Sequence, residues 1–196
     1  MNKPFFIKEI FSIDDTYKNK LINFFDCDYN NQFDHLHNRK YFFKDVDSSF
    51  ILYKFDICDE KKFIKFLKIS DKFIFNIETI YGKGKLYNLQ IAKLKSKGKI
   101  PEHIDRALFY LFSHRIHVPL ITNQDVIFSI GENKYNLKEN IVYEVNNSRE
   151  HSVINKTDNF ERVHLILDYV TEEYFNYYEI IHSHFRKSRK SKFFNK

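Results

Sequence analysis

Beyond the Gly82-Lys83-Gly84 turn, apolar and polar residues alternate in short runs that are separated by turn-forming residues. Alternation with a period of two indicates strands with one buried face, because successive side chains of a strand point to opposite sides. Gly131-Glu132-Asn133 lies between two such runs and predicts a hairpin. The expected strands span 86–94, 106–122 (long enough to bend or split), 126–130, 135–137, 141–145, 151–155 and 162–170. Many short strands at this spacing are typical of a β-sandwich or barrel.

Residues 1–84 carry a different pattern, in which apolar side chains often recur at helical spacing. A helix is expected over 13–25, with Ser12 or Asp14 as its N-cap, and a second helix is expected to begin near Asp59. Between the two helices, strands are expected at 41–43 and 50–53, and a polar loop at 28–37. This part of the chain is therefore predicted to add a mixed helical and strand layer to the β-region.

The C-terminal end returns to helical spacing behind Thr171-Glu172-Glu173. This is a capping sequence, because a threonine and the acidic residues after it stabilise the free N–H groups of a first helical turn. No internal repeat or linker divides the chain, so one domain is expected over residues 1–196. Its expected parts are an N-terminal mixed region (1–84), a β-region (85–170), a C-terminal helix (171–185) and a basic tail (186–196).

The composition is that of a globular chain of 196 residues with an unusual choice of cations. Hydrophobic residues make up 43% and charged residues 30%, a balance that excludes a disordered chain. Lysine outnumbers arginine 25 to 7, and the net charge is +6. The basic run 186–192 raises the possibility of contact with nucleic acid, but the lysine bias of the whole chain favours a solvated tail instead. The scarce arginines are therefore the more informative cations.

Cys27 and Cys58 have neither zinc-type spacing nor partner cysteines. Free cysteines of this kind are usually buried thiols in a reducing compartment. The first 17 residues carry several charges, so no signal peptide is expected, and no apolar run is long enough to span a bilayer. We therefore expect a cytoplasmic protein, soluble and intracellular, with no membrane partner.

The first candidate site combines His103 and Asp105 with His151, which lies far downstream. In an extended chain, residues i and i+2 point to the same side, so His103 and Asp105 can face one ion. Two histidines and one carboxylate form the facial triad of non-haem iron(II) oxygenases, which leaves coordination positions open for a cosubstrate and oxygen. A His-x-Asp pair alone is weak evidence, because the segment beside Pro101 also reads as a surface loop.

Two of the expected strands carry one polar and one apolar face. In one strand Arg115 and His117 share a face, and in another Arg162, His164 and Asp168 do, with apolar residues between them. Ordinary amphipathic strands with a solvated polar face give the same pattern. The alternative is a barrel whose polar interior holds an anion. Arginine suits that role, because its planar fork binds a carboxylate through two hydrogen bonds.

These motifs belong to a longer series. Five segments follow one another in the region 86–170: Ala92-Lys93-Leu94, Gly98-Lys99-Ile100-Pro101-Glu102-His103-Ile104-Asp105, Arg115-Ile116-His117-Val118-Pro119-Leu120-Ile121-Thr122-Asn123, His151-Ser152-Val153-Ile154-Asn155 and Arg162-Val163-His164-Leu165-Ile166-Leu167-Asp168. Each segment is weak alone, but their order and spacing together resemble the aspartyl/asparaginyl β-hydroxylase family. The remaining N-terminal part and the tail carry no resemblance.

The resemblance implies a fold class that is mainly β with flanking helices: a double-stranded β-helix, the jelly-roll of cupin-like oxygenases. Residues 85–170 would be the jelly-roll region. The resemblance also implies that His103, Asp105 and His151 ligate Fe(2+). Some family members lack the carboxylate, whereas this chain keeps an aspartate at the matching position. Ser152 and Asn155 are candidates to orient the histidine rings.

The same resemblance assigns the cosubstrate contacts. Arg162 would bind the distal carboxylate of 2-oxoglutarate, and Arg115 and His117 would hold the end nearer the metal. His164 matches the family pattern without an assigned role. The implied reaction is that of a 2-oxoglutarate-dependent dioxygenase, a hydroxylase that uses O2. It decarboxylates 2-oxoglutarate to succinate and places a hydroxyl group on an unactivated C–H bond. No catalytic residue beyond the metal ligands is assigned.

The substrate-binding residues and the substrate are not identified by the sequence. The family name suggests an aspartyl or asparaginyl residue of a protein, and related enzymes also act on free amino acids and small molecules. A small-molecule or peptide substrate is therefore expected, a nucleic-acid partner is not, and the oligomeric state is left open. The alternative is a catalytically inactive cupin-like binding or regulatory protein, which would keep the barrel without turnover.

Overall fold

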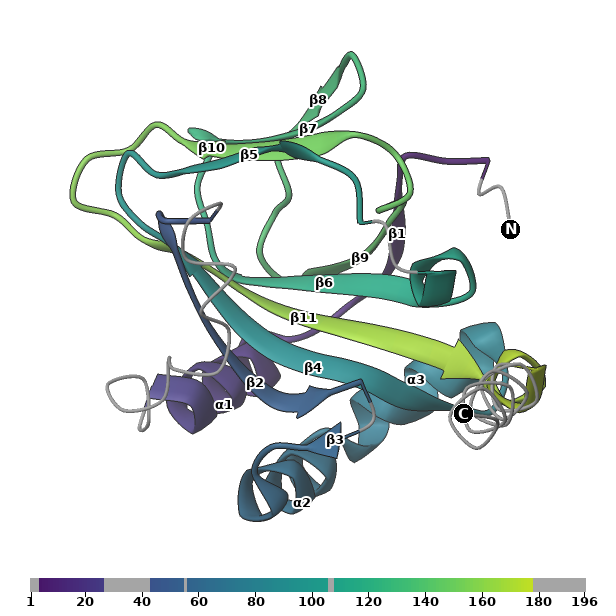
Figure 1. Ribbon diagram of the computed structural model, residues 1–196. Helices are drawn as coiled ribbons and strands as arrows, with labels where there is room; N and C mark the ends of the chain where they lie inside the picture. The colour runs from purple at the N-terminus through teal and green to yellow at the C-terminus, as the bar shows by residue number, and fades with distance from the viewer. Residues whose placement is uncertain (1–3, 27–42, 55, 106–107, 178–196) are drawn as a thin grey trace, which may run out of the picture.

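The computed structural model describes residues 4–26, 43–54, 56–105 and 108–177, which form two β-sheets and a layer of helices (Figure 1). Seven strands form the larger sheet, in the spatial order β1 (Ile7–Ser12), β9 (Ile141–Val145), β6 (His114–Ile121), β11 (Arg162–Thr171), β4 (Gly84–Leu94), β2 (Val46–Tyr53) and β3 (Asp56–Ile57). Four strands form the smaller sheet, in the order β5 (Lys99–His103), β10 (His151–Asn155), β7 (Val126–Ile130) and β8 (Asn133–Tyr135).

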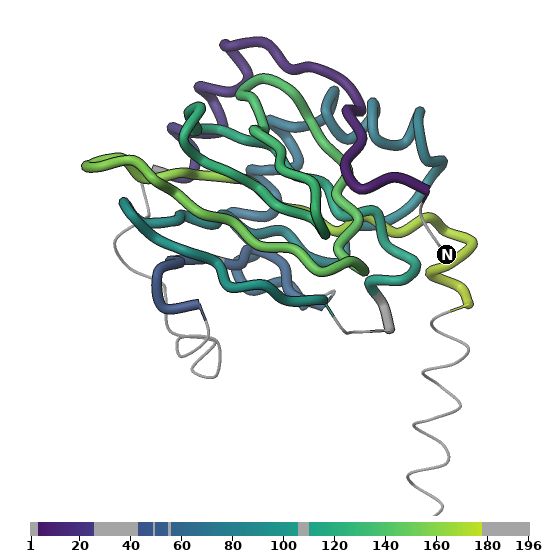
Figure 2. The backbone as a smooth tube through the Cα atoms, turned by 90° about the horizontal axis from the view of Figure 1, so that it is seen from above, coloured from purple at the N-terminus to yellow at the C-terminus, as the bar shows by residue number. Residues whose placement is uncertain are grey.

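From β4 to β11 the chain winds back and forth between the two sheets. β4, β6, β9 and β11 belong to the larger sheet, and the strands that alternate with them belong to the smaller one. The pairs are antiparallel, and the two layers face each other in Figure 1. In the view from above in Figure 2, the smaller sheet lies over the larger one. This winding is a double-stranded β-helix. The predicted fold class, mainly β with a jelly-roll, is confirmed.

Three helices cover the face of the larger sheet that is turned away from the smaller sheet (Figure 1). They are α1 (Asp15–Asp26), α2 (Glu60–Ile69) and α3 (Asp71–Tyr81). Asp14 caps α1 by accepting a hydrogen bond from the Tyr17 N–H at 2.7 Å, and Asp59 caps α2 in the same way. The sequence predicted α1 and α2. It did not predict α3, which follows α2 after Ser70 alone.

The alternation along β6 and β11 explains this layering. Ile116, Val118 and Leu120 of β6 are buried against the helices, together with Leu165 and Leu167 of β11. Because side chains alternate along a strand, the polar residues between them point to the other side, between the two sheets. A second apolar cluster, which includes Leu94, Phe128, Val145 and Val153, packs between the two sheets. The larger sheet is therefore buried on both faces.

Several strands differ from the sequence-based expectation. β1 was not predicted. The long strand expected over 106–122 is wrong at its start, because residues 108–111 form a 3-10 turn and the strand begins at His114. The hairpin at Gly131 is confirmed, since this glycine has φ of 54° and the second strand pairs back from Asn133.

Other predicted segments lie wholly or partly outside the described residues. The polar loop 28–37, the basic tail 186–196 and most of the strand expected at 41–43 lie outside them, and the C-terminal helix is described only over 172–177. Phe43 is described and is not in a strand. These segments remain predictions.

The prediction for the cysteines is wrong for Cys58, whose thiol is exposed beside β3, and Cys27 lies outside the described residues. Cys58 breaks the general tendency because it occupies a short turn between β3 and α2 instead of a packed face. No described helix is both long enough and apolar enough to cross a lipid bilayer.

Replacing Gly84 with alanine is expected to lower the free energy of unfolding by about 2–3 kcal/mol. A Cβ atom at this position would lie 2.1 Å from the carbonyl oxygen of Val170 and 2.7 Å from the Tyr169 ring, so the end of the β4–β11 ladder would have to shift. Urea denaturation measures the change. Lys83→Ala, at the exposed neighbour, should stay within about 0.5 kcal/mol of the wild type. A Gly84→Ala protein of wild-type stability would contradict this close contact.

Candidate functional site

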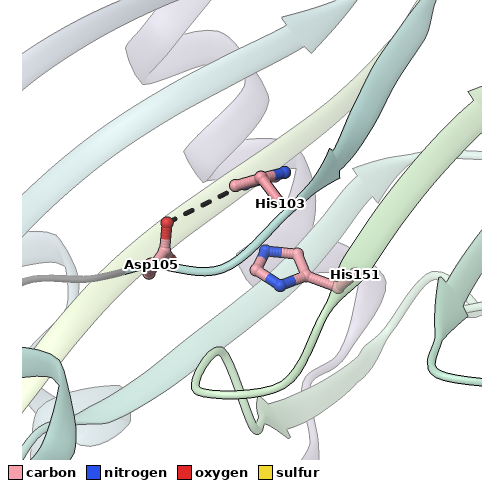
Figure 3. Close-up of side chains that lie close together, drawn as sticks. All are labelled: His103, Asp105 and His151. Atoms are coloured by element: carbon pink, nitrogen blue, oxygen red, sulfur yellow. Dashed lines mark ion pairs between the residues drawn. The ribbon is translucent and has the colours of Figure 1, made fainter.

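Two strands of the smaller sheet bring the two predicted ligand histidines together. In the antiparallel pair of β5 and β10, His103 lies directly opposite His151. The centroids of their imidazole rings are 4.2 Å apart. Asp105 follows β5 by two residues and turns its carboxylate to the same place (Figure 3). One ligand atom from each of the three side chains lies within 4.8 Å of the others.

The backbone fixes both imidazole rings through their Nδ1 atoms. Nδ1 of His103 lies 2.8 Å from the carbonyl oxygen of Pro101, and Nδ1 of His151 lies 2.9 Å from that of Arg149. A carbonyl oxygen accepts hydrogen bonds and cannot donate them, so each Nδ1 carries the proton. Each Nε2 then presents a lone pair, which is the form in which an imidazole binds a metal.

The prediction that Ser152 or Asn155 orients the rings is wrong. The Asn155 amide donates to the carbonyl oxygens of Lys95 and Phe160, at 3.0 and 2.7 Å, and so ties the end of β10 to the turn after β4. Ser152 follows His151 along β10 and points to the other side of the strand. The rings are oriented by backbone carbonyl groups instead. Every residue has such a group, so the sequence does not indicate which residues play this role.

The two carboxylate oxygens of Asp105 have different partners. Oδ2 accepts hydrogen bonds from Nη1 of Arg115 at 2.6 Å and from Nδ2 of Asn147 at 3.2 Å. Oδ1 lies 3.8 Å from Nε2 of His103. Burial raises the pKa of this carboxyl group, but the charge of Arg115 and the neighbouring groups outweigh burial, and the pKa is lowered overall. Asp105 is therefore an anion with one oxygen turned to the histidines.

The protonation state of His151 agrees with a role as a ligand. Burial lowers the pKa of His151 to about 4, so this ring is neutral at physiological pH. Two imidazole nitrogens and one carboxylate oxygen are the donors of the iron(II) facial triad. His103, Asp105 and His151 thus fit Fe(2+) both in chemistry and in their mutual distances.

The three side chains lie on the wall of a cavity of about 480 Å³ between the two sheets. The polar faces of β6 and β11 line the same cavity with Arg115, His117 and Arg162, which are all buried. The polar residues of these strands are therefore not a solvated surface. The interpretation of a barrel with a polar interior is confirmed, and the site residues predicted from distant parts of the sequence share one cavity.

A buried cluster holds Arg162 in place. Nη2 of Arg162 lies 2.5 Å from Nδ1 of His164, and this nitrogen lies 3.4 Å from Nδ1 of His117. A guanidinium group only donates hydrogen bonds, so Nδ1 of His164 accepts the bond and His164 is uncharged. The sequence assigned no role to His164. In the structure it is the buried hydrogen-bond acceptor that orients Arg162.

Stability is expected to fall as the pH drops below the usual histidine pKa of 6.5. Burial holds the pKa values of His117 and His164 well below 6.5 in the folded protein, whereas both residues can take up a proton in the unfolded chain. The unfolded state therefore binds more protons below this pH. The free energy of unfolding should decrease by up to about 1.4 kcal/mol per pH unit for each histidine.

Urea denaturation from about pH 7.5 down to about pH 5.5 measures this dependence. His164→Gln removes one of the buried histidines whose pKa is lowered and should give a shallower dependence on pH than the wild type. Equal stability of the wild type at both ends of the range would contradict the buried, neutral state of the two histidines.

Arg115 reaches the cavity but is already bound to acidic side chains. Its Nε and Nη2 atoms donate to the two carboxylate oxygens of Asp168 at 2.9 and 3.1 Å, and Nη1 donates to Asp105. Asp168 is fully buried and faces the same side of β11 as Arg162. The structure therefore adds Asp168 and Asn147 to the site, which sequence reasoning had not assigned.

The remaining wall of the cavity comes from residues that the sequence did not single out. Phe43, Phe50 and Tyr53 line it from β2 and the residues before it, and the Phe43 ring is 5.0 Å from the His103 ring. Gln90 of β4 also lines it and is buried, and no hydrogen bond of its side-chain amide occurs within the described ranges. In the sequence, the residues of β2 and β4 among them are marked only by the alternation of apolar and polar positions. This alternation does not distinguish side chains that line a cavity from side chains of a packed core.

Comparison with known proteins decides the family. Residues 31–172 match the model of the family described as aspartyl/asparaginyl β-hydroxylase, which is well over half of the chain. The chain belongs to the aspartyl/asparaginyl β-hydroxylase family. The resemblance predicted from five motifs in 86–170 is thereby confirmed. The match also extends into the N-terminal part, where the sequence had offered no resemblance.

Solved structures share the fold of this β-hydroxylase family member. A 2-oxoglutarate-Fe(II) oxygenase family oxidoreductase from Burkholderia pseudomallei has a TM-score of 0.63 at 13% identity, covering 84% of this chain and 82% of its own. HygX from Streptomyces hygroscopicus, solved with nickel and 2-oxoglutarate bound, has a TM-score of 0.58 at 11% identity, covering 85% and 83%. A prolyl-4-hydroxylase from Pseudomonas putida has a TM-score of 0.55 at 10% identity, covering 85% and 91%.

At these identities the structural likeness establishes the fold, and the family match establishes the kind of enzyme. No curated protein matches the chain. As an aspartyl/asparaginyl β-hydroxylase family member with a His-Asp-His group, the protein is a 2-oxoglutarate-dependent oxygenase with iron(II) and O2 as the partners of the reaction. The predicted enzyme class and cofactors are thus confirmed, and the roles of individual residues and the substrate are left for the proposals below.

Proposed function

We propose that the protein hydroxylates an unactivated C–H bond and that His103, Asp105 and His151 hold the iron(II). The observation that carries this assignment is the register of β5 and β10, which places two histidines opposite each other with the carboxylate of Asp105 beside them. Both rings already have their Nδ1 protons fixed on carbonyl groups, so little reorganisation is needed to present both Nε2 atoms to a metal.

The proposed holders of 2-oxoglutarate are Arg162, Arg115 and His117. All three line the cavity that also contains the three metal-binding side chains, and all three are buried. An arginine in a water-poor cavity binds a carboxylate through charge-assisted hydrogen bonds that are stronger than neutral ones. The bond from Arg162 to His164 fixes the guanidinium group before any ligand arrives, which reduces the entropy lost on binding.

The protein side chains position the reactants, and iron(II) with bound 2-oxoglutarate and O2 supplies the oxidising chemistry. Phe128 and Ile166 lie in the cavity wall beside the polar groups, and Phe43 packs against His103. These apolar side chains exclude water from the reacting centre and strengthen its electrostatic contacts. The side chains of the protein thus bind and orient the reactants and exclude water from them. The proposed reaction requires no further residue as a proton donor or acceptor.

The proposed substrate is an aspartyl or asparaginyl residue, a free amino acid or a related small molecule. The family supplies the first possibility, and the cavity has features that suit all three. Gln90 offers a donor and an acceptor that match an amide or a carboxylic acid, and the aromatic side chains of Phe50 and Tyr53 provide an apolar surface beside it. A peptide fits this picture too, since a related fold, a Trichoplax adhaerens prolyl hydroxylase, was solved with a peptide fragment bound.

Turnover of 2-oxoglutarate in the absence of substrate tests the proposal. Purified protein with iron(II) and ascorbate is expected to release succinate slowly, and an amino-acid or peptide panel should contain members that accelerate the release. The Asp105→Ala and His103→Ala variants should release none. Binding of 2-oxoglutarate without succinate, with every member of the panel, would instead favour the inactive cupin-like alternative.

A further inference from the structure

Gln90 of β4 turns a buried amide group into the cavity. The side chain lines the cavity, and the residue is only 7% exposed. Among the residues that the structure describes, no group forms a hydrogen bond with this amide. A glutamine amide has two N–H donors and an acceptor oxygen, and leaving such a group buried without partners costs free energy. A polar ligand in the cavity would supply the missing partners.

Asn88, on the same face of β4 two residues earlier, shows how a buried amide is satisfied when its role is structural. Its Nδ2 atom donates to Oδ2 of Asp168 at 2.7 Å, and its Oδ1 atom accepts a hydrogen bond from the backbone N–H of Lys54 at 2.8 Å. Both ends of the Asn88 amide are therefore used within the protein. The contrast with Gln90 indicates that the Gln90 amide serves what enters the cavity.

The side chains beside Gln90 carry no charge. In the two ladders of β4, Gln90 lies opposite Ile166 of β11 and Phe50 of β2, and both of these residues line the cavity. Along β4, its neighbours on the same face are Asn88 and Ala92. Burying an anion without a cationic partner is costly. The immediate surroundings of Gln90 therefore favour a neutral polar group over a charged one.

Phe50 and Tyr53 form an apolar wall next to Gln90. Their ring centroids are 5.0 Å apart with an interplanar angle of 70°, an edge-to-face contact that holds both rings at the cavity wall. Aromatic side chains at this position lower the local dielectric constant and exclude water that would compete for the amide. A hydrogen bond made by Gln90 is strengthened in such surroundings.

We propose that Gln90 is a specificity-determining residue that binds a primary carboxamide group of the substrate, such as that of an asparagine or glutamine side chain. The Nε2 atom of Gln90 donates to the carboxamide oxygen, and Oε1 accepts from the carboxamide N–H. The proposal rests on the proposed hydroxylase function and narrows its substrate class, which the function itself leaves open between acids and amides.

Other polar groups fit the Gln90 amide less well. A carboxylic acid is ionised at neutral pH, so it accepts the bond from Nε2 but donates none, and Oε1 is left facing an anion. A trans peptide bond points its N–H and C=O groups in opposite directions, so it cannot make both bonds with one side chain. A primary carboxamide carries N–H and C=O on the same side and satisfies both ends of Gln90.

Paired substrates that differ only in this group test the proposal. The pairs are L-asparagine with L-aspartate, L-glutamine with L-glutamate, and a peptide that carries a single asparagine with its aspartate counterpart. Substrate-stimulated release of succinate gives kcat/KM for each member. The wild type is expected to favour a carboxamide over its acid by about 100-fold or more, because a buried polar group discriminates strongly against a substrate that leaves it unpaired. Equal use of amide and acid in every pair would overturn the proposal.

Gln90→Leu removes both hydrogen bonds at nearly constant volume. It should lower kcat/KM for the preferred carboxamide about 10- to 100-fold and bring the amide-to-acid ratio to within about 10-fold. Gln90→Glu keeps one acceptor and should lower turnover of the amide while still excluding the acid. Gln124→Leu is the matched control, since this glutamine is exposed in the turn after β6, and it should behave as the wild type.

Three further measurements separate this role from the alternatives. Gln90→Leu should leave the urea midpoint unchanged or raise it, because it removes an unpaired buried amide. A lowered midpoint with an unchanged amide preference would instead make Gln90 a structural residue. At saturating iron(II), its affinity for 2-oxoglutarate should stay within about 3-fold of the wild type, and a loss of about 10-fold would assign Gln90 to the cosubstrate. Substrate-free release of succinate by the wild type tests the oxygenase function itself, independently of Gln90.

Discussion

His151→Ala is expected to lose high-affinity iron(II) binding and, with it, all measurable release of succinate. His151 supplies one of the three donor groups and is buried opposite His103, so no nearby side chain or bulk water replaces it easily. Groups that merely orient a ligand are typically worth 10- to 100-fold in metal affinity. Removal of the ligand itself should therefore cost more than about 100-fold.

Equilibrium dialysis of iron(II) under argon measures this loss, and succinate release under air measures its effect on turnover. Ile154→Ala is the matched control, because it lies on the same strand with an exposed side chain and truncates it in the same way. The control should bind iron(II) and turn over like the wild type. Residual iron(II) affinity within about 10-fold of wild type in His151→Ala would show that the histidine pair is not the metal centre.

The second large effect is expected for Arg162→Met, in the affinity for 2-oxoglutarate. Truncating one partner of a buried, hydrogen-bonded charge pair costs about 2–5 kcal/mol. A loss of about 3 kcal/mol corresponds to a dissociation constant for 2-oxoglutarate that is raised by roughly 100-fold. Arg162 is almost completely buried on the cavity side of β11, so solvent screening should reduce the effect little.

Calorimetric titration of 2-oxoglutarate into metal-loaded protein measures this change, and iron(II) affinity without cosubstrate should stay close to the wild-type value. Arg162→Lys should recover part of the affinity, because lysine keeps the charge but loses the two-pronged geometry. If Arg162→Met bound 2-oxoglutarate as the wild type does, the cosubstrate would have to sit elsewhere in the cavity.

Much of the fold could be predicted from local pattern. The alternation of apolar and polar residues predicted the first and last residues of β9 and β10 correctly. The capping residues Asp14 and Asp59 indicated where α1 and α2 begin. These features depend on neighbours in the chain, which a sequence displays directly. The 3-10 turn before β6 and the helix α3 were missed, because apolar residues there satisfy helical, turn and strand patterns alike.

By itself, then, the sequence determined the donor types: two histidines, an aspartate and the scarce arginines that form the site, in an order that named the family. Only the tertiary structure decided which of these side chains meet. The register of β5 and β10 places His103 opposite His151, and the register of β6 and β11 pairs Arg115 with Asp168. Register and partner choice depend on contacts between residues far apart in the chain, and a period-two pattern is the same for every register that keeps the buried face buried.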